Sequence, residues 1–147
     1  MGSTGTHKFQ LKTVDHIGIH VRDCEKVIET WERMFGIGPW AILENSSTDA
    51  EGKTFTTRLA FAYLDELEIE LIQPPEGRRK FIDTHGEGLN HWGFFVDDLK
   101  GETDNLVAQG ATIVAQGPPD SWVYFDCGGP GGVIFELMKR RGKITDR

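Results

Sequence analysis

Cysteine is scarce in this chain, positive charge is outnumbered by negative charge, and no apolar run is long. The two cysteines among 147 residues, Cys24 and Cys127, are far apart and lack a Cys-x-x-Cys spacing, so they suggest neither a disulfide framework nor a thiolate metal site. They favour a reducing, cytoplasmic setting. With 16 Lys and Arg against 23 Asp and Glu, the net charge of −7 disfavours nucleic acid and anionic membrane surfaces as partners. Because no apolar run reaches membrane-spanning length, we also expect no membrane partner.

A short pattern occurs twice in the sequence. Residues 15–23 read DHIGIHVRD and residues 90–98 read NHWGFFVDD, with a histidine, a glycine, a valine and a final aspartate in register. Each half then ends on a strand-like run that carries glutamate, at residues 67–72 (LEIELI) and 133–138 (VIFELM). The repetition indicates two copies of one folding unit, each supplying a histidine and a glutamate.

Each copy predicts a strand, a helix and three further strands. Asp23 and Asp98 are expected to cap the helices, which end at Gly36 and Gly110. Alternating and β-branched residues predict strands at residues 13–21, 40–43, 55–64, 66–73, 89–96, 111–116, 122–127 and 133–139. The polar residues 44–53 are expected to form an exposed loop.

This order of elements predicts an α+β fold. Two tandem βαβββ modules, at residues 11–74 and 86–140, should form a curved, cup-like mixed sheet with the helices outside. The length suits one domain over residues 1–147, with residues 1–10 as a loose N-terminal tail.

Alternation along the predicted strands places the repeated polar residues on one face. Ile17 and Ile19 lie opposite His16, and Phe135 and Leu137 lie opposite Glu136. If the helices cover the apolar face, the histidines and glutamates line the inside of the cup. A carboxylate there is costly to desolvate without a positive partner, and no lysine or arginine shares this strand face with Glu136.

A divalent metal ion would supply the missing positive charge. Two imidazoles and two carboxylates form a four-ligand site that suits Zn, Ni, Co, Fe or Mn. The glycines two residues after the histidines, Gly18 and Gly93, agree with this site, since a side chain there would intrude on the space above the metal. One His–Glu pair is more often structural, but two matching pairs on matching strand faces favour a metal site.

With these motifs the sequence resembles the vicinal oxygen chelate superfamily, the glyoxalase/bleomycin resistance/dioxygenase group, over about residues 13–139. The resemblance is to the methylmalonyl-CoA epimerase branch first and to glyoxalase I next. It rests on residues 15–19 (DHIGI), 69–74 (IELIQP), 88–94 (GLNHWGF), 96–99 (VDDL) and 132–137 (GVIFEL). The resemblance implies one divalent metal ion with His16, Glu70, His91 and Glu136 as its ligands.

The number of ligands bears on the reaction. Four protein ligands leave about two positions open on a six-coordinate ion, enough for a substrate that chelates through two oxygens. We therefore predict an isomerase or epimerase, similar to methylmalonyl-CoA epimerase, that acts through a stabilised enolate on an acyl thioester, an oxo acid or a similar small molecule. Glu136 is the first candidate for the proton-transfer base and Glu70 is the second.

Three alternatives remain open at this stage. The first is a glyoxalase I-type lactoylglutathione lyase. The second is a non-catalytic small-molecule binding or resistance protein, against which four retained ligands count. The third is a ring-cleaving dioxygenase, in which a fourth protein ligand would occupy room that oxygen and substrate need.

Four further residues are candidates for contacting the substrate: His20, Arg58, Tyr124 and Asp126. His20 shares the inner face with His16, and Tyr124 and Asp126 share a face of their own strand. We also expect a homodimer, because a curved open sheet leaves edges that need protection.

Overall fold

The computed structural model describes residues 10–139, so all but one residue of the predicted N-terminal tail, and residue 140 of the second predicted module, lie outside it. Eight strands and two α-helices longer than two turns form most of this region, with a shorter helix and a 3₁₀ turn between strands. The elements are β1 (His16–His20), α1 (Cys24–Phe35), β2 (Ala41–Thr48), β3 (Thr54–Leu64), β4 (Leu67–Gln73), α2 (Lys80–His85), β5 (Gly88–Val96), α3 (Leu99–Ala108), β6 (Thr112–Gln116), β7 (Trp122–Asp126), η1 (Pro130–Gly132) and β8 (Ile134–Lys139).

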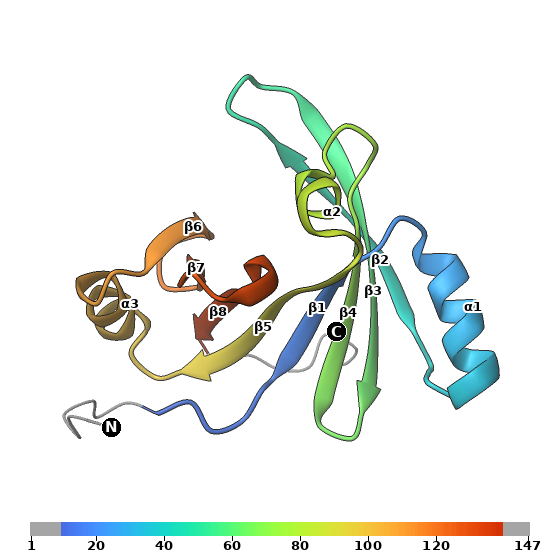
Figure 1. Cartoon of the computed structure of the whole chain (residues 1–147), viewed down its shortest axis with the longest axis horizontal. Helices are drawn as coiled ribbons and strands as arrows, with labels where there is room; N and C mark the ends of the chain where they lie inside the picture. Colours follow the sequence, from blue (N-terminus) through green and yellow to red (C-terminus); the bar gives the residue numbers. More distant parts are fainter. Residues whose placement is uncertain (1–9, 140–147) are drawn as a thin grey trace.

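All eight strands belong to one mixed sheet, which confirms the predicted α+β fold. Their order is β2-β3-β4-β1-β5-β8-β7-β6. Strand β1 runs parallel to β4, β5 runs parallel to β8, and β1 and β5 meet antiparallel at the centre. Counted from its own edge of the sheet to the centre, each half therefore has the same order: its second, third, fourth and first strand. The sheet curls into a half-barrel, and α1 and α3 lie on opposite sides of the molecule (Figure 1).

Each half has its own apolar core. Helix α1 contributes buried Cys24 and Ile28 to a cluster with Ile69 and Leu71 of β4. Helix α3 contributes Leu99 to a second cluster on the other half of the sheet, built largely from aromatic and branched residues of β5, β7 and β8. The helices thus cover the apolar face of the sheet, as the strand alternation predicted, and leave the polar residues on the inner face.

Both long helices begin at the predicted aspartates. The side chain of Asp23 accepts a hydrogen bond from the backbone N–H of Lys26, and Asp98 accepts one from Gly101. Each carboxylate satisfies an N–H that the first turn of a helix leaves unpaired. Gly36 ends α1 in the left-handed conformation, which glycine adopts without steric cost.

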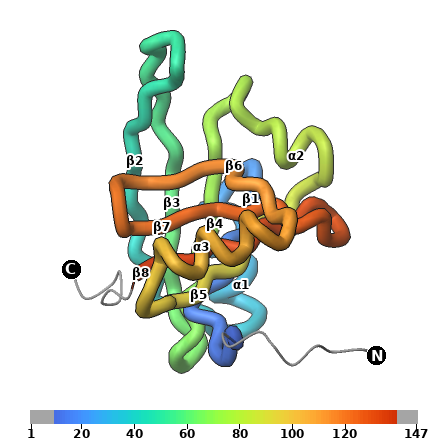
Figure 2. Tube along the Cα trace, turned by 90° about the vertical axis from the view of Figure 1, so that its left-hand side faces the viewer, coloured from blue at the N-terminus to red at the C-terminus, as the bar shows by residue number. Residues whose placement is uncertain are grey.

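Strand β2 is longer than predicted. It continues through Thr48 into the segment expected to be a loop, and it pairs residue by residue with β3, from Ala41 opposite Phe61 to Thr48 opposite Thr54. Most of β2 is exposed, so its sequence does not alternate between apolar and polar residues, which is the pattern that predicts a strand. The far end of this hairpin extends beyond the rest of the sheet (Figure 2). Within residues 10–139 no helix combines the length and apolar character needed to cross a membrane.

Candidate metal centre

Two rows of residues, one from each half, run across the inner face of the sheet. In the first row, His91 of β5 lies opposite Gly18 of β1, which pairs with Glu70 of β4, which in turn pairs with Phe61 of β3. Every step in this row is a register pair between neighbouring strands, so backbone hydrogen bonding sets the positions of all four residues.

The second row repeats the first with the halves exchanged. His16 of β1 lies opposite Gly93 of β5, which pairs with Glu136 of β8, which pairs with Tyr124 of β7. The histidine of each half therefore stands in the same row as the glutamate of the other half. Because the two rows cross the central β1–β5 pair side by side, four side chains from both halves meet at one place.

The glycine in each row makes room for an imidazole. A Cβ atom at Gly18 would lie 2.1 Å from Cε1 of His91, and one at Gly93 would lie 2.0 Å from Cε1 of His16. No other residue fits beneath these rings without moving them. The sequence interpretation, in which the glycines keep the space above a metal open, is wrong in this detail: each glycine receives the ring of the opposite histidine.

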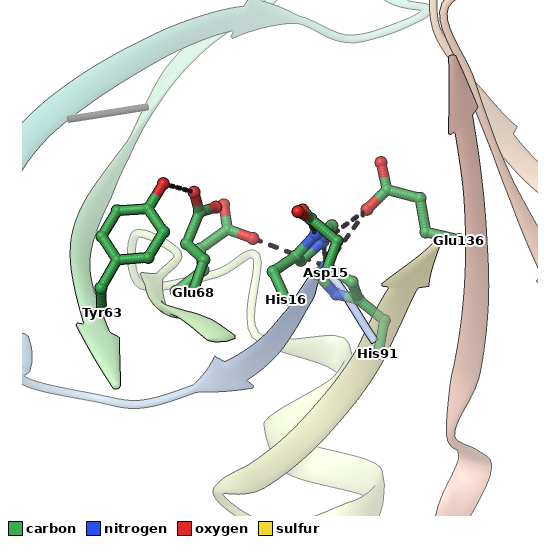
Figure 3. Close-up of polar contacts among 7 residues, drawn as sticks. Asp15, His16, Tyr63, Glu68, His91 and Glu136 are labelled. Carbon is green, nitrogen blue, oxygen red and sulfur yellow. Dashed lines mark hydrogen bonds and ion pairs between the residues drawn. The ribbon is translucent and has the colours of Figure 1, made fainter. Parts of the chain in front are cut away.

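Three of the four side chains form a tight cluster (Figure 3). Nε2 of His16 lies 3.2 Å from Nε2 of His91 and 2.9 Å from Oε1 of Glu136, and His91 Nε2 lies 3.4 Å from that same oxygen. Oε1 of Glu70 lies 3.5 Å from His91 Nε2. All three residues of the tight cluster are buried, with His91 completely inaccessible to solvent.

The ring orientations are set by the residue that precedes each histidine. Nδ1 of His16 donates to the carboxylate of Asp15 over 3.0 Å, and Nδ1 of His91 donates to the side-chain oxygen of Asn90 over 2.8 Å. With the proton on Nδ1, a neutral ring presents the lone pair of Nε2 to the cluster. Sequence reasoning missed these two residues, although an aspartate or asparagine before each repeated histidine was a visible signal.

The donor set fits a metal ion. Two Nε2 lone pairs and a carboxylate oxygen within 2.9 to 3.4 Å of one another repel unless a cation lies between them. Such separations are those expected between ligand atoms that each lie about 2.0–2.2 Å from one first-row metal ion. The ligand atoms of His16, His91 and Glu136 all lie within 4.8 Å of one another.

The electrostatics of His16 point to the same demand for positive charge. Burial lowers the pKa of His16, but the hydrogen bonds to Asp15 and Glu136 and the negative charges of Glu136 and Glu70 outweigh burial and raise the pKa to about 10. The cluster therefore attracts a cation, either a proton on this ring or a metal ion in its place.

A second polar group lies beside the first. Glu68 is 1% exposed, and the hydroxyl of Tyr63 donates to its carboxylate over 2.5 Å. One ligand atom from each of Asp15, His16 and Glu68 lies within 4.8 Å of the others. Asp15 accepts a hydrogen bond from His16, and Glu68 accepts one from Tyr63, so hydrogen bonds explain why these polar side chains lie close together. The group lies next to the tight cluster (Figure 3).

Of the four residues predicted to contact a substrate, two lie near the cluster. The ring of Tyr124 packs 5.0 Å from that of His91, centroid to centroid. His20 lies on the inner face with its ring 5.1 Å from Phe81 of α2, and burial together with the charge of His91, partly offset by Glu70, lowers its pKa to about 4.

The structure does not bring the other two to the cluster. Arg58 makes ion pairs with Glu25 of α1 and, over 2.9 Å, with Glu44 of β2. It lies two residues before the buried Ala60 and therefore on the same, helix-covered face of β3. Asp126 is exposed, and its carboxylate accepts from the backbone N–H of Gly128 over 2.8 Å, which stabilises the turn after β7. Both side chains therefore have structural partners other than the residues of the cluster.

Comparison with known proteins identifies one family. The model of the family described as the Glyoxalase/Bleomycin resistance protein/Dioxygenase superfamily matches residues 15–124. Uncharacterized protein YwbC of Bacillus subtilis (strain 168) is 29% identical over 132 residues, which cover 88% of this chain and 98% of that protein.

Solved structures share the fold at lower identity. The hypothetical protein BH1468 of Bacillus halodurans C-125 is 21% identical, with a TM-score of 0.66 over 89% of this chain and 96% of that one. The methylmalonyl-CoA epimerase of Mycobacterium tuberculosis is 23% identical, with a TM-score of 0.64 over 96% of each chain. At these identities the likeness establishes the arrangement of the backbone alone.

Proposed function

Because the chain belongs to the Glyoxalase/Bleomycin resistance protein/Dioxygenase superfamily, we propose that it is a divalent-metal-dependent epimerase or isomerase that removes and returns a proton beside a substrate carbonyl. His16, Glu70, His91 and Glu136 are the proposed metal ligands. One observation supports the proposal: His16 Nε2, His91 Nε2 and Glu136 Oε1 lie within 3.4 Å of one another, and Glu70 Oε1 lies 3.5 Å from His91 Nε2.

The metal ion, when bound, polarises a substrate carbonyl and stabilises the negative charge that develops when the neighbouring C–H loses its proton. The side chains of this protein then have separate tasks. His16 and His91 offer Nε2 because Asp15 and Asn90 hold their Nδ1 protons. Burial of the cluster excludes bulk water, which strengthens each of these electrostatic interactions.

The proton is proposed to move to Glu136. The contacts of this carboxylate with the imidazoles all use Oε1, which leaves Oε2 as the proposed proton acceptor. Glu70, which approaches from the opposite half, is the proposed second base and would return the proton from the other side. Two bases on opposite sides of one carbon are what an epimerisation needs.

The proposed substrate is a small acyl thioester or oxo acid with an acidic C–H next to its carbonyl. The fold likeness to methylmalonyl-CoA epimerases supports this class, since one such epimerase was solved with methylmalonyl-CoA bound, at a TM-score of 0.66 and 18% identity. Turnover of methylglyoxal with a thiol would instead assign the chain to a glyoxalase-type reaction.

The test begins with metal analysis of the purified protein. We expect about one divalent ion per chain, and we expect its loss in His91→Ala. Exchange of the substrate α-hydrogen with deuterated water, followed by NMR across acyl thioesters and oxo acids, should require the metal and fall by about 10²- to 10⁴-fold in Glu136→Gln.

Glu29→Gln provides the matched control, because Glu29 is an exposed glutamate on the outer helix α1. This variant should exchange protons at the rate of the unmodified protein. Purified protein without stoichiometric metal, or undiminished exchange in Glu136→Gln, would contradict the proposal.

We also propose a homodimer in a reducing, cytoplasmic setting. The edge strands β2 and β6 are largely exposed, and such edges invite pairing with a second chain. Both cysteines are free thiols, Cys24 buried and Cys127 exposed, which agrees with a reducing environment.

A further inference from the structure

The two rows that build the site differ at one position. Glu70 pairs across the sheet with Phe61, whereas Glu136 pairs with Tyr124. The next register partner outward is alanine in both rows, Ala41 in the first and Ala115 in the second. A phenyl ring therefore stands next to one glutamate where a phenol stands next to the other.

The phenol of Tyr124 belongs to the inner face of the cup. Its neighbours along β7, Val123 and Phe125, lie in the apolar core on the opposite face. Its ring packs 5.0 Å from His91 and 5.0 Å from Trp122, centroid to centroid. A tyrosine hydroxyl keeps its proton at neutral pH and can therefore donate a hydrogen bond.

The hydroxyl of Tyr124 makes no hydrogen bond to any other residue within the part of the chain that the structure describes. Tyr124 is half-buried, and its hydroxyl is not enclosed by protein atoms, so a small molecule in the cup can reach it. Tyr63, the other tyrosine of the chain, instead donates to Glu68 over 2.5 Å. Packing alone does not require a hydroxyl at this row position, since Phe61, 4% exposed, fills the corresponding place in the other half.

We propose that Tyr124 is a substrate-binding residue, whose hydroxyl donates a hydrogen bond to an anionic oxygen of a substrate held in the cup. This inference rests on the proposed function and deepens it. The anionic oxygen of the substrate then faces β7, where Tyr124 lies. On the β3 side the phenyl ring of Phe61 has no hydrogen-bond donor. The phenol thus gives a nearly symmetric site a single orientation for an unsymmetric ligand.

The experiment uses the full chain loaded with Co²⁺, whose visible absorption reports on ligands that enter the metal site. Oxalate is the probe, because it is a small dianion with two oxygens on adjacent carbons. The Tyr124→Phe substitution should weaken oxalate binding by roughly 10- to 100-fold, because it removes a hydrogen bond to a charged group. The affinity for Co²⁺ should stay unchanged, since the phenol is not a ligand.

Two comparisons separate a hydrogen bond from a general disturbance. Tyr63→Phe removes a phenol hydroxyl that already has a protein partner, and it should leave oxalate binding within about twofold. Imidazole, a nitrogen ligand with no oxygen to accept a hydrogen bond, should bind Tyr124→Phe as well as it binds the unmodified protein.

Each contrary result has a distinct meaning. Equal oxalate affinity in Tyr124→Phe, or equal weakening of oxalate and imidazole, overturns the role of Tyr124 and leaves the proposed metal site standing. Failure of the unmodified protein to bind Co²⁺ overturns the proposed function, and the role of Tyr124 with it.

Discussion

The two imidazoles at the centre of the cup have unequal supporting partners. Asp15 places a carboxylate against Nδ1 of His16, whereas Asn90 places a neutral amide oxygen against Nδ1 of His91. A carboxylate acceptor makes the imidazole a stronger electron donor than an amide does. His16 is therefore expected to be the stronger ligand of the two, although both rings occupy equivalent positions in the repeat.

This difference predicts the outcome of a reciprocal exchange. Asp15→Asn should weaken metal binding by about 10- to 100-fold because His16 loses its charged partner. Asn90→Asp should bind metal at least as tightly as the unmodified protein, because His91 gains such a partner. Competition with a chromophoric chelator measures both affinities. Equal affinity in Asp15→Asn and the unmodified protein would show that the charge of Asp15 does not act through His16.

At the scale of elements, the caps of the two long helices were predictable because the cap is local. An aspartate followed by a helical apolar pattern predicts the first turn without knowledge of the rest of the fold. Strand β2 was predicted too short for the opposite reason. Its outer part pairs only with β3 and buries little, so no alternation of apolar residues revealed it.

The cap of α1 should contribute measurably to stability. Asp23→Ala removes the acceptor for the N–H of Lys26 at the start of the helix that covers the first core, and it should lower the free energy of unfolding by about 1 kcal/mol. Urea unfolding followed by circular dichroism measures the change. Asp97→Ala is the control, since Asp97 is exposed and precedes the cap of α3, and it should stay within about 0.5 kcal/mol. Equal loss in both variants would mean that negative charge, rather than the cap, is responsible.

At the scale of the whole molecule, the two apolar cores are separate and the central strands join the halves. The first core holds residues of α1 and β4, and the second holds residues of α3, β5, β7 and β8. The β1–β5 pair joins the two halves, and the proposed ligands on the inner face of the sheet come from both halves. A metal ion bound there would act as a cross-link between the halves.

Metal binding should therefore raise the melting temperature of the entire chain in one transition. At a free metal concentration about 1,000 times the Kd, the stabilisation should be about 4 kcal/mol. Thermal unfolding with added Zn²⁺, and again after excess chelator, measures this effect. His91→Ala should lose the metal-dependent shift. His85→Ala, which replaces an exposed histidine on α2, should keep it. An unchanged shift in His91→Ala would place the metal elsewhere.

By itself the sequence determined the repeat, the strand faces and the helix caps. All three follow from short-range rules: side chains alternate along a strand, and an aspartate caps the turn that follows it. The same rules led to the candidate ligands, because a glutamate and a histidine on matching faces of repeated strands must lie on the same side of one sheet.

Only the tertiary structure decided which residues face each other across strands. It placed each glycine beneath the opposite histidine, paired Arg58 with Glu25 on the helix side, and set Tyr124 and Phe61 in corresponding positions. Cross-strand register pairs residues far apart in the sequence, such as His16 with Gly93 and Gly93 with Glu136, and so brings the side chains of His16 and Glu136 together from 120 positions apart. Because the register is fixed by backbone pairing over the whole sheet, no local pattern in the sequence carries that information.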